Sequence, residues 1–107
     1  MSFAVLLTDD ALRDLEGVDD YIVAHDGPGK VEYVLGEIRD ALLGLGDMPE
    51  RGTFPKELLA LGLKEYREIF FQPYRIIYRV FEKQVLIYII ADGRRDMESL
   101  LARRLLG

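Results

Sequence analysis

Residues 66–96 read YREIFFQPYRIIYRVFEKQVLIYIIADGRRD and are the most β-prone part of the chain. β-Branched and aromatic side chains dominate residues 66–71, 74–81 and 85–91, and short turns separate these segments. This composition and spacing predict three strands connected as an antiparallel meander. Asp92-Gly93 is a turn sequence that ends the last strand.

The second and third predicted strands are apolar on both faces, because even and odd positions of 76–81 and 85–90 both carry mostly apolar side chains. An antiparallel sheet that exposes one face to water normally shows polar residues there. One helical hairpin covers only one face, so the second face needs another cover. Two covers remain open: the C-terminal helix of the chain itself, or a partner chain that adds a helix or a strand.

The N-terminal half predicts a short strand followed by a helical hairpin. Residues 3–7 are an apolar run of strand length, and Thr8 offers an N-cap oxygen to a helix over residues 9–25. The turn sequence DGPG at 26–29 separates this helix from a second apolar stripe over residues 31–45.

The rest of the chain adds a loop over 47–63, in which residues 57–61 are expected to make one helical turn, and a final helix that Asp96 caps. The predicted order is β-α-α-β-β-β-α. This is an α+β fold, a small antiparallel sheet with an N-terminal αα-hairpin on one face. No repeat or linker divides the sequence, so residues 1–107 are expected to form a single domain.

Composition excludes several kinds of site. The 107 residues include no cysteine and one histidine, which excludes a disulfide framework, a thiolate metal site and a His-rich zinc centre. We expect neither a metal nor a small-molecule cofactor, and at this size any site is expected to be a surface groove. No export signal and no apolar run of about 18 residues is present, so a cytoplasmic protein without membrane contact is expected.

The formal net charge of −5 hides a strong asymmetry. Residues 1–50 carry three cations against twelve carboxylates, whereas residues 51–107 carry eleven cations against seven carboxylates. One part of the surface is therefore expected to be acidic and another basic.

Arginines interrupt the apolar strands. The period of two places Arg75 and Arg79 on one face, and Arg67 on the preceding strand is expected near them. Two more arginines, Arg94 and Arg95, follow the last predicted strand. We predict that these guanidiniums line a target-binding or anion-binding groove; the alternative is that each pairs with a neighbouring carboxylate. The five residues are Arg67, Arg75, Arg79, Arg94 and Arg95.

Four segments in this order, YREI at 66–69, YRIIYRV at 74–80, VLIYII at 85–90 and GRRD at 93–96, resemble the RelE/ParE superfamily of bacterial toxins from type II toxin–antitoxin systems. The N-terminal strand, the helix that carries Asp14 and the PERG loop at 49–52 match in order as well. The resemblance implies a growth-inhibiting toxin that a small cognate antitoxin protein wraps and neutralises. The residues expected to face the antitoxin are Tyr78, Tyr88, Leu101 and Leu105.

The resemblance implies one of two targets, DNA gyrase or mRNA on the ribosome. Arg75 and Arg94 match phosphate-stabilising arginines of the nuclease members and would be catalytic only in a nuclease. RNA cleavage also needs a general acid and base, yet Asp92 and Met97 stand where many relatives carry His and Tyr or His.

We therefore expect a ParE-like gyrase inhibitor, which is not an enzyme, ahead of a RelE-type ribosome-dependent mRNA endoribonuclease. The net negative charge also disfavours docking on ribosomal RNA. An inactive relic that still binds its antitoxin remains an alternative.

Overall fold

The computed structural model describes residues 2–106 and has the predicted order of elements. The elements are β1 (Ala4–Leu7), α1 (Asp9–Asp26), α2 (Pro28–Asp47), α3 (Lys56–Leu59), β2 (Arg67–Phe71), β3 (Tyr74–Phe81), β4 (Gln84–Asp92), α4 (Met97–Leu101) and the π-helical turn η1 (Ala102–Leu106). As expected, the Thr8 side chain caps α1 by accepting a hydrogen bond from the Ala11 N–H at 3.1 Å. Gly27 makes the turn between the first two helices at φ +87°, a conformation that favours glycine.

The sheet has the strand order β1-β4-β3-β2. β2, β3 and β4 form the predicted antiparallel meander, and β1 adds to the edge of β4 in parallel. Ile77 pairs with Ile89 and Tyr78 pairs with Ile87, so Tyr88 is an extra residue in β4, a β-bulge. The bulge lies just beyond the point where the pairing with β1 ends.

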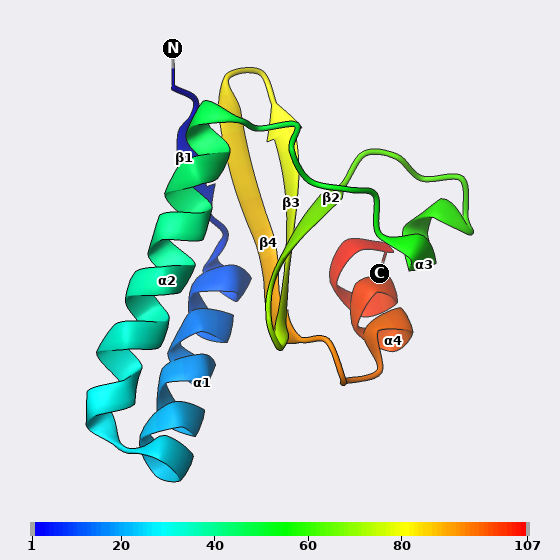
Figure 1. Ribbon diagram of the computed structural model, residues 1–107. Helices are drawn as coiled ribbons and strands as arrows, with labels where there is room; N and C mark the ends of the chain where they lie inside the picture. The colour runs from blue at the N-terminus through cyan, green and yellow to red at the C-terminus, as the bar shows by residue number, and fades with distance from the viewer. Residues whose placement is uncertain (1, 107) are drawn as a thin grey trace.

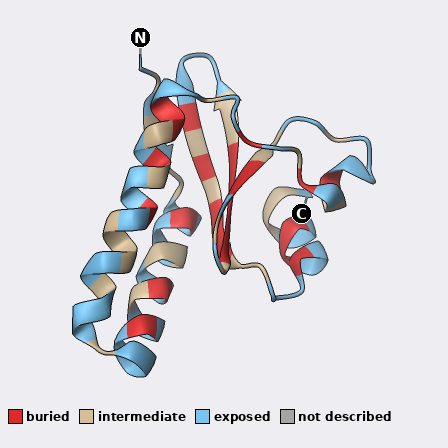
Figure 2. Cartoon of the chain, in the orientation of Figure 1, coloured by how far each residue is buried: buried red, intermediate tan, exposed pale blue. Residues whose placement is uncertain are grey.

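Each face of the sheet has its own apolar core. α1 and α2 cover one face, and α3 and α4 lie on the other side (Figure 1). Buried residues line both sides of the sheet and the inner sides of the helices (Figure 2). The second core gathers Leu58 of α3 and Leu100 of α4 over Ile77 and Ile89.

The chain's own C-terminal part thus covers much of the second face of the sheet. This is the first of the two alternatives that the sequence allows. The cover is partial, since Leu6 and Phe81 are still 45% and 50% exposed.

Tyr78 fixes the loop that precedes α3. Its hydroxyl donates to the Pro49 carbonyl at 2.7 Å and accepts from the Gly52 N–H at 3.0 Å. We expect Tyr78 from the sequence to face the antitoxin, but the structure buries it fully on the α1–α2 side. The reason is that even positions of β3 point toward the helical hairpin and the hydroxyl has two backbone partners there.

Arg75 attaches α3 to the second face of the sheet. Its Nη1 and Nη2 each donate to a carboxylate oxygen of Glu57 at 2.8 Å, and its Nε donates to Glu68 at 2.7 Å. The three side chains are only 6–16% exposed. The hydrogen bonds from Arg75 hold the pKa of Glu57 below its usual value, whereas burial raises the pKa of Glu68.

Gly52→Ala tests the loop attachment. A Cβ at this position would lie 2.5 Å from the Tyr78 hydroxyl and 2.7 Å from the Glu68 carbonyl. We expect a loss of about 1–3 kcal/mol in the free energy of unfolding, measured by urea denaturation. Gly36→Ala in α2 is the control, because no atom lies within 4 Å of its Cβ position; it should gain up to about 1 kcal/mol. Equal effects of the two changes would contradict this account of Gly52.

Arg75→Ala tests the buried cluster. Removal of the guanidinium leaves two buried carboxylates without a partner, and we expect a loss of about 3–5 kcal/mol in unfolding free energy at pH 8. The loss should shrink toward pH 4.5, because unpaired buried carboxylates have raised pKa values and become protonated as the pH falls. Arg79→Ala, which removes a half-exposed guanidinium 4.0 Å from Glu65, should cost less than about 1 kcal/mol at both pH values. A pH-independent loss for Arg75→Ala would refute a charge-based role.

Candidate functional site

The five predicted arginines do not share one groove. Arg75 and Arg79 lie on one face, as their spacing predicts, but Arg67 pairs with Tyr78 and therefore lies on the other face. Arg67 donates to the Gly52 carbonyl at 2.9 Å and lies 4.6 Å from the centre of the Phe54 ring. The expectation that Arg67 lies near the other two arginines is therefore wrong, because the register of β2 against β3 depends on contacts that the sequence does not reveal.

Arg75 and Arg94 each form ion pairs with neighbouring carboxylates. This agrees with the alternative that the sequence leaves open, in which each arginine pairs locally. The two carboxylates described above hold Arg75 in the interior. Arg94 is 74% exposed and pairs with Asp92 at 2.5 Å, which lowers the pKa of Asp92 to about 2. Arg79 lies 4.0 Å from Glu65 and 5.6 Å from the centre of the Phe81 ring, and Arg95 makes no ion pair with any residue in the range 2–106. Arg94 and Arg95 are thus both exposed, but of the five predicted arginines only Arg95 carries an exposed charge without an ion-pair partner within residues 2–106.

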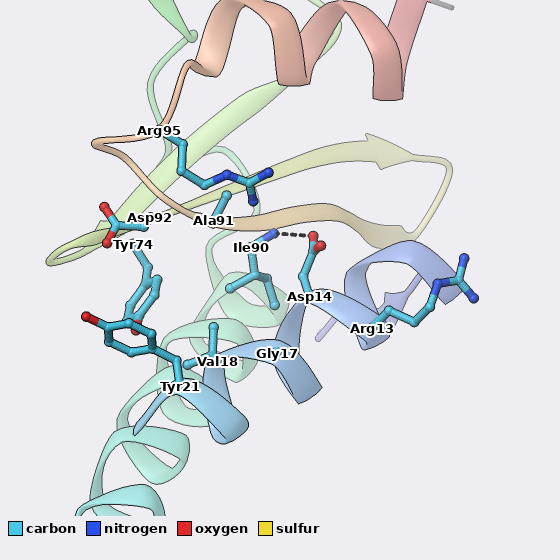
Figure 3. Close-up of a pocket in the computed structure, with 10 residues that line it drawn as sticks. All are labelled: Arg13, Asp14, Gly17, Val18, Tyr21, Tyr74, Ile90, Ala91, Asp92 and Arg95. Atoms are coloured by element: carbon cyan, nitrogen blue, oxygen red, sulfur yellow. Dashed lines mark hydrogen bonds between the residues drawn. The ribbon is translucent and has the colours of Figure 1, made fainter. Parts of the chain in front are cut away.

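Three open hollows surround the end of the sheet at the β2–β3 turn, with volumes of about 380, 420 and 350 Å³. The first, between α1 and the end of β4, is drawn in Figure 3. Tyr21 and Tyr74 line both the first and the third hollow, and Arg94 lines both the second and the third. The hollows therefore form one continuous band around this end of the molecule.

Exposed aromatic residues and arginines dominate this band, which we call the turn-end surface and define as Tyr21, Tyr33, Phe70, Arg94 and Arg95. The three aromatic residues are 52–63% exposed. Tyrosine and arginine are enriched at protein–protein interfaces. These aromatic residues are not among the site residues expected from the sequence; the signal for two of them is that Tyr21 and Tyr33 lie off the apolar stripes of their helices.

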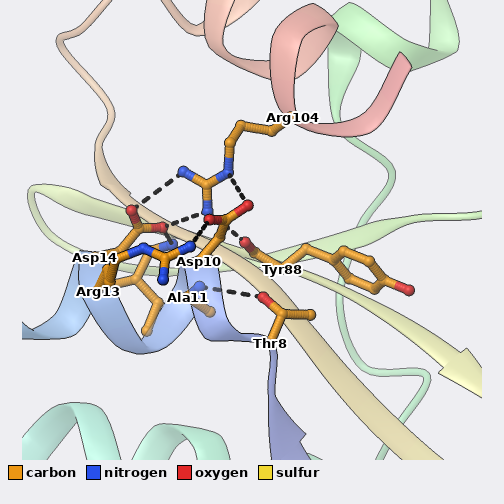
Figure 4. Close-up of polar contacts among 8 residues, drawn as sticks. Thr8, Asp10, Ala11, Arg13, Asp14, Tyr88 and Arg104 are labelled. Carbon is orange, nitrogen blue, oxygen red and sulfur yellow. Dashed lines mark hydrogen bonds and ion pairs between the residues drawn. The ribbon is translucent and has the colours of Figure 1, made fainter. Parts of the chain in front are cut away.

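A second polar cluster joins the C-terminal turn to α1 (Figure 4). Arg104 donates to both carboxylate oxygens of Asp14, at 2.9 and 3.1 Å, and to the Tyr88 carbonyl at 2.7 Å. Asp14 also accepts from the Ile90 N–H at 3.0 Å. Arg104 and Asp14 are 15% and 14% exposed. This cluster holds η1 against α1 and the outer edge of β4.

The C-terminal residues predicted to face the antitoxin have different environments. Leu101 is buried between α4 and the sheet, whereas Leu105 and Tyr88 are half-buried. The Tyr88 ring packs edge-on against Tyr66 with the ring centres 5.4 Å apart. Leu101 is thus a core residue in this structure, because α4 itself supplies the cover over Ile89.

The histidine of the chain makes no hydrogen bond or ion pair with an arginine within residues 2–106. His25 stacks on Tyr21 near the end of α1, with ring centres 4.0 Å apart. Met97 is buried, and Asp92 is engaged by Arg94. Within residues 2–106, no cluster of three metal-ligating side chains occurs. None of the helices in this part of the chain is both long and apolar enough to cross a membrane.

Comparison with solved structures reveals the same fold in two toxin–antitoxin complexes. One, described as the chromosomal ParDE system from P. aeruginosa, aligns with a TM-score of 0.71 and 20% identity over 85% of this chain and 96% of that chain. The other, the RelBE2 complex from Mycobacterium tuberculosis, aligns with a TM-score of 0.59 and 21% identity over 86% of this chain and 92% of that chain. No curated protein sequence matches the chain.

The family model that matches describes the ParE toxin of the type II toxin–antitoxin system parDE, and the match spans residues 5–97. This range includes all of the sheet except Ala4, the helical hairpin and the turn that carries Arg94 and Arg95. It confirms the resemblance that the sequence analysis found on the strand and turn segments. The chain therefore belongs to the ParE toxin family of type II toxin–antitoxin systems.

Proposed function

We propose that this ParE-family toxin inhibits DNA gyrase and is neutralised by a cognate antitoxin. The observation that carries the choice of gyrase over mRNA is the state of Arg75. In the nuclease members, the matching arginine stabilises a phosphate. Here two carboxylates occupy its guanidinium, with distances of 2.7–2.8 Å, and the side chain is only 9% exposed. A guanidinium in this state is not available to an RNA phosphate.

The residues near Arg94 support the same choice. General acid–base catalysis needs a proton donor and acceptor within hydrogen-bond reach of the reacting atoms. Asp92 is held ionised by Arg94, and the buried Met97 has no proton to transfer. Neither residue therefore supplies the general acid or base that cleavage of RNA requires.

The turn-end surface is the proposed contact with gyrase. Its exposed rings offer apolar area, Arg95 offers an unpaired positive charge to an acidic patch of the partner, and Arg94 offers an exposed guanidinium that is paired with Asp92. The acidic exposed sides of α1 and α2 make a nucleic acid a poor partner for the rest of the molecule.

The test is a supercoiling assay with purified gyrase, run beside a ribosome-dependent mRNA cleavage assay. We expect inhibition of supercoiling and intact mRNA. The double variant Arg94→Ala/Arg95→Ala should inhibit about tenfold less well, because rim and hot-spot arginines together contribute on the order of 1–2 kcal/mol. Arg39→Ala/Lys83→Ala is the matched control, since it removes two exposed cations outside the turn-end surface and should inhibit like the wild type.

The other possible results of these two assays would each indicate a different function. Cleaved mRNA with unaffected supercoiling would establish the RelE-type endoribonuclease and refute gyrase inhibition. Absence of both activities, together with tight binding to the antitoxin, would identify an inactive relic.

A further inference from the structure

The outer edge of β4 is longer than the strand that covers it. β1 pairs only with Gln84–Ile87, whereas β4 continues to Asp92. The parallel ladder begins with the Ala4 N–H donating to the Lys83 carbonyl at 3.2 Å. It ends with the Thr8 N–H donating to the Ile87 carbonyl at 3.0 Å. α1 then begins, so the backbone groups of β4 that point away from β3 beyond the bulge face no strand.

At the first position beyond the end of β1, side chains take the place of a neighbouring strand and bind the outer backbone groups of β4. In a parallel ladder, a residue on one strand donates its N–H to the carbonyl before its opposite residue and accepts from the N–H after it. Around Ile89 these two groups are the Tyr88 carbonyl and the Ile90 N–H. Arg104 donates to the first at 2.7 Å, and Asp14 accepts from the second at 3.0 Å. Together the two side chains reproduce the bonds of one strand residue.

The next pair of outward-pointing backbone groups on this edge of β4, the Ile90 carbonyl and the Asp92 N–H, has no such partners in the described part of the chain. The Gly93 N–H donates to the Pro73 carbonyl at 2.8 Å, so Asp92 and Tyr74 form a non-hydrogen-bonded pair and the Asp92 N–H points away from β3. The Ile90 carbonyl points the same way as the Ile90 N–H that Asp14 binds. Neither the Ile90 carbonyl nor the Asp92 N–H has a hydrogen bond with any group in residues 2–106.

This unpartnered pair of backbone groups lies in the hollow between α1 and β4. The hollow has a volume of about 380 Å³, and Tyr21, Gly17 and Tyr74 line it beside Ile90 and Asp92. Figure 3 shows Arg95 extending over the edge from the turn after β4. The space, the two unpaired backbone groups and an unpaired guanidinium therefore occur together.

We propose that an extended segment of the antitoxin adds to this edge in parallel to β4. One of its residues donates its N–H to the Ile90 carbonyl and accepts from the Asp92 N–H, and an acidic side chain of the segment pairs with Arg95. The proposal rests on the proposed function, since it takes the antitoxin as the partner. The parallel direction follows because an antiparallel strand opposite Ile90 needs the Ile90 N–H, which Asp14 already binds.

The backbone contact is tested by a pair of substitutions at one position. Asp92→Pro removes the side chain and the N–H, whereas Asp92→Ala removes the side chain alone. Proline is tolerated at a strand end when its missing N–H points away from the neighbouring strand. We expect the Pro variant to bind the full-length cognate antitoxin about tenfold more weakly than the Ala variant, measured by calorimetry. Thermal unfolding of both free variants checks that each is folded.

A second pair of substitutions tests the hollow without a change in β4. No atom lies within 4 Å of a Cβ at Gly17, so Gly17→Leu extends a side chain into the hollow from a helix that accepts it. We expect at least a tenfold loss of antitoxin affinity. Gly36→Leu on α2 also has open space at its Cβ position and lines none of the three hollows; it should bind like the wild type.

The outcomes separate this proposal from the proposed function. Equal affinities of the Pro and Ala variants, with Gly17→Leu binding like Gly36→Leu, would refute strand addition and leave the toxin–antitoxin pairing intact. Failure of the wild-type chain to bind the antitoxin would overturn both. Hydrogen exchange gives an independent readout: the Asp92 amide should exchange at least tenfold more slowly in the wild-type complex than in the free toxin, and unchanged exchange would count against the proposal.

Discussion

The nine-residue strand β4 has to satisfy its outer backbone edge beside a strand of only four residues. Buried backbone groups without a partner are costly, so the groups directly after the end of β1 need other partners. Asp14 from α1 and Arg104 from η1 provide them at Tyr88 and Ile90. This requirement explains why the two ends of the chain, ninety positions apart, meet at one edge of the sheet.

The second constraint is the buried charge of Arg75. A sheet face that contains an arginine can be closed only if the guanidinium is fully paired. Glu57 and Glu68 meet this condition, and α3 is thereby held over the second face together with its apolar Leu58. The same pairing removes Arg75 from the set of groups that can bind an external anion. A closed second face and an accessible Arg75 are therefore incompatible in this chain.

The sequence predicted the element order because the local signals were strong: alternating and continuous apolar runs for the strands, Thr8 as a cap, and the DGPG turn. It did not predict the grouping of the arginines. Arg67 falls on the opposite face from Arg75 because of the pairing register, which depends on contacts between strands. The roles of Asp14 and Arg104 depend on distant contacts as well. Nothing in the residues around either position indicates that they share the backbone groups of β4.

The charge asymmetry of the chain gains a structural meaning from these contacts. η1 carries Arg104 to the first turns of α1, where Asp10 lies 3.6 Å from it and Asp14 binds it directly. The acidic half therefore attracts the basic C-terminal segment, and part of the negative charge serves to close the fold. The exposed acidic residues farther along α1 and on α2 have no such role. They repel nucleic acids and acidic surfaces alike, and Asp26 at the end of α1 lines the same hollow as Arg94, so the accessible positive charge at the end of β4 is confined to the turn that carries Arg95.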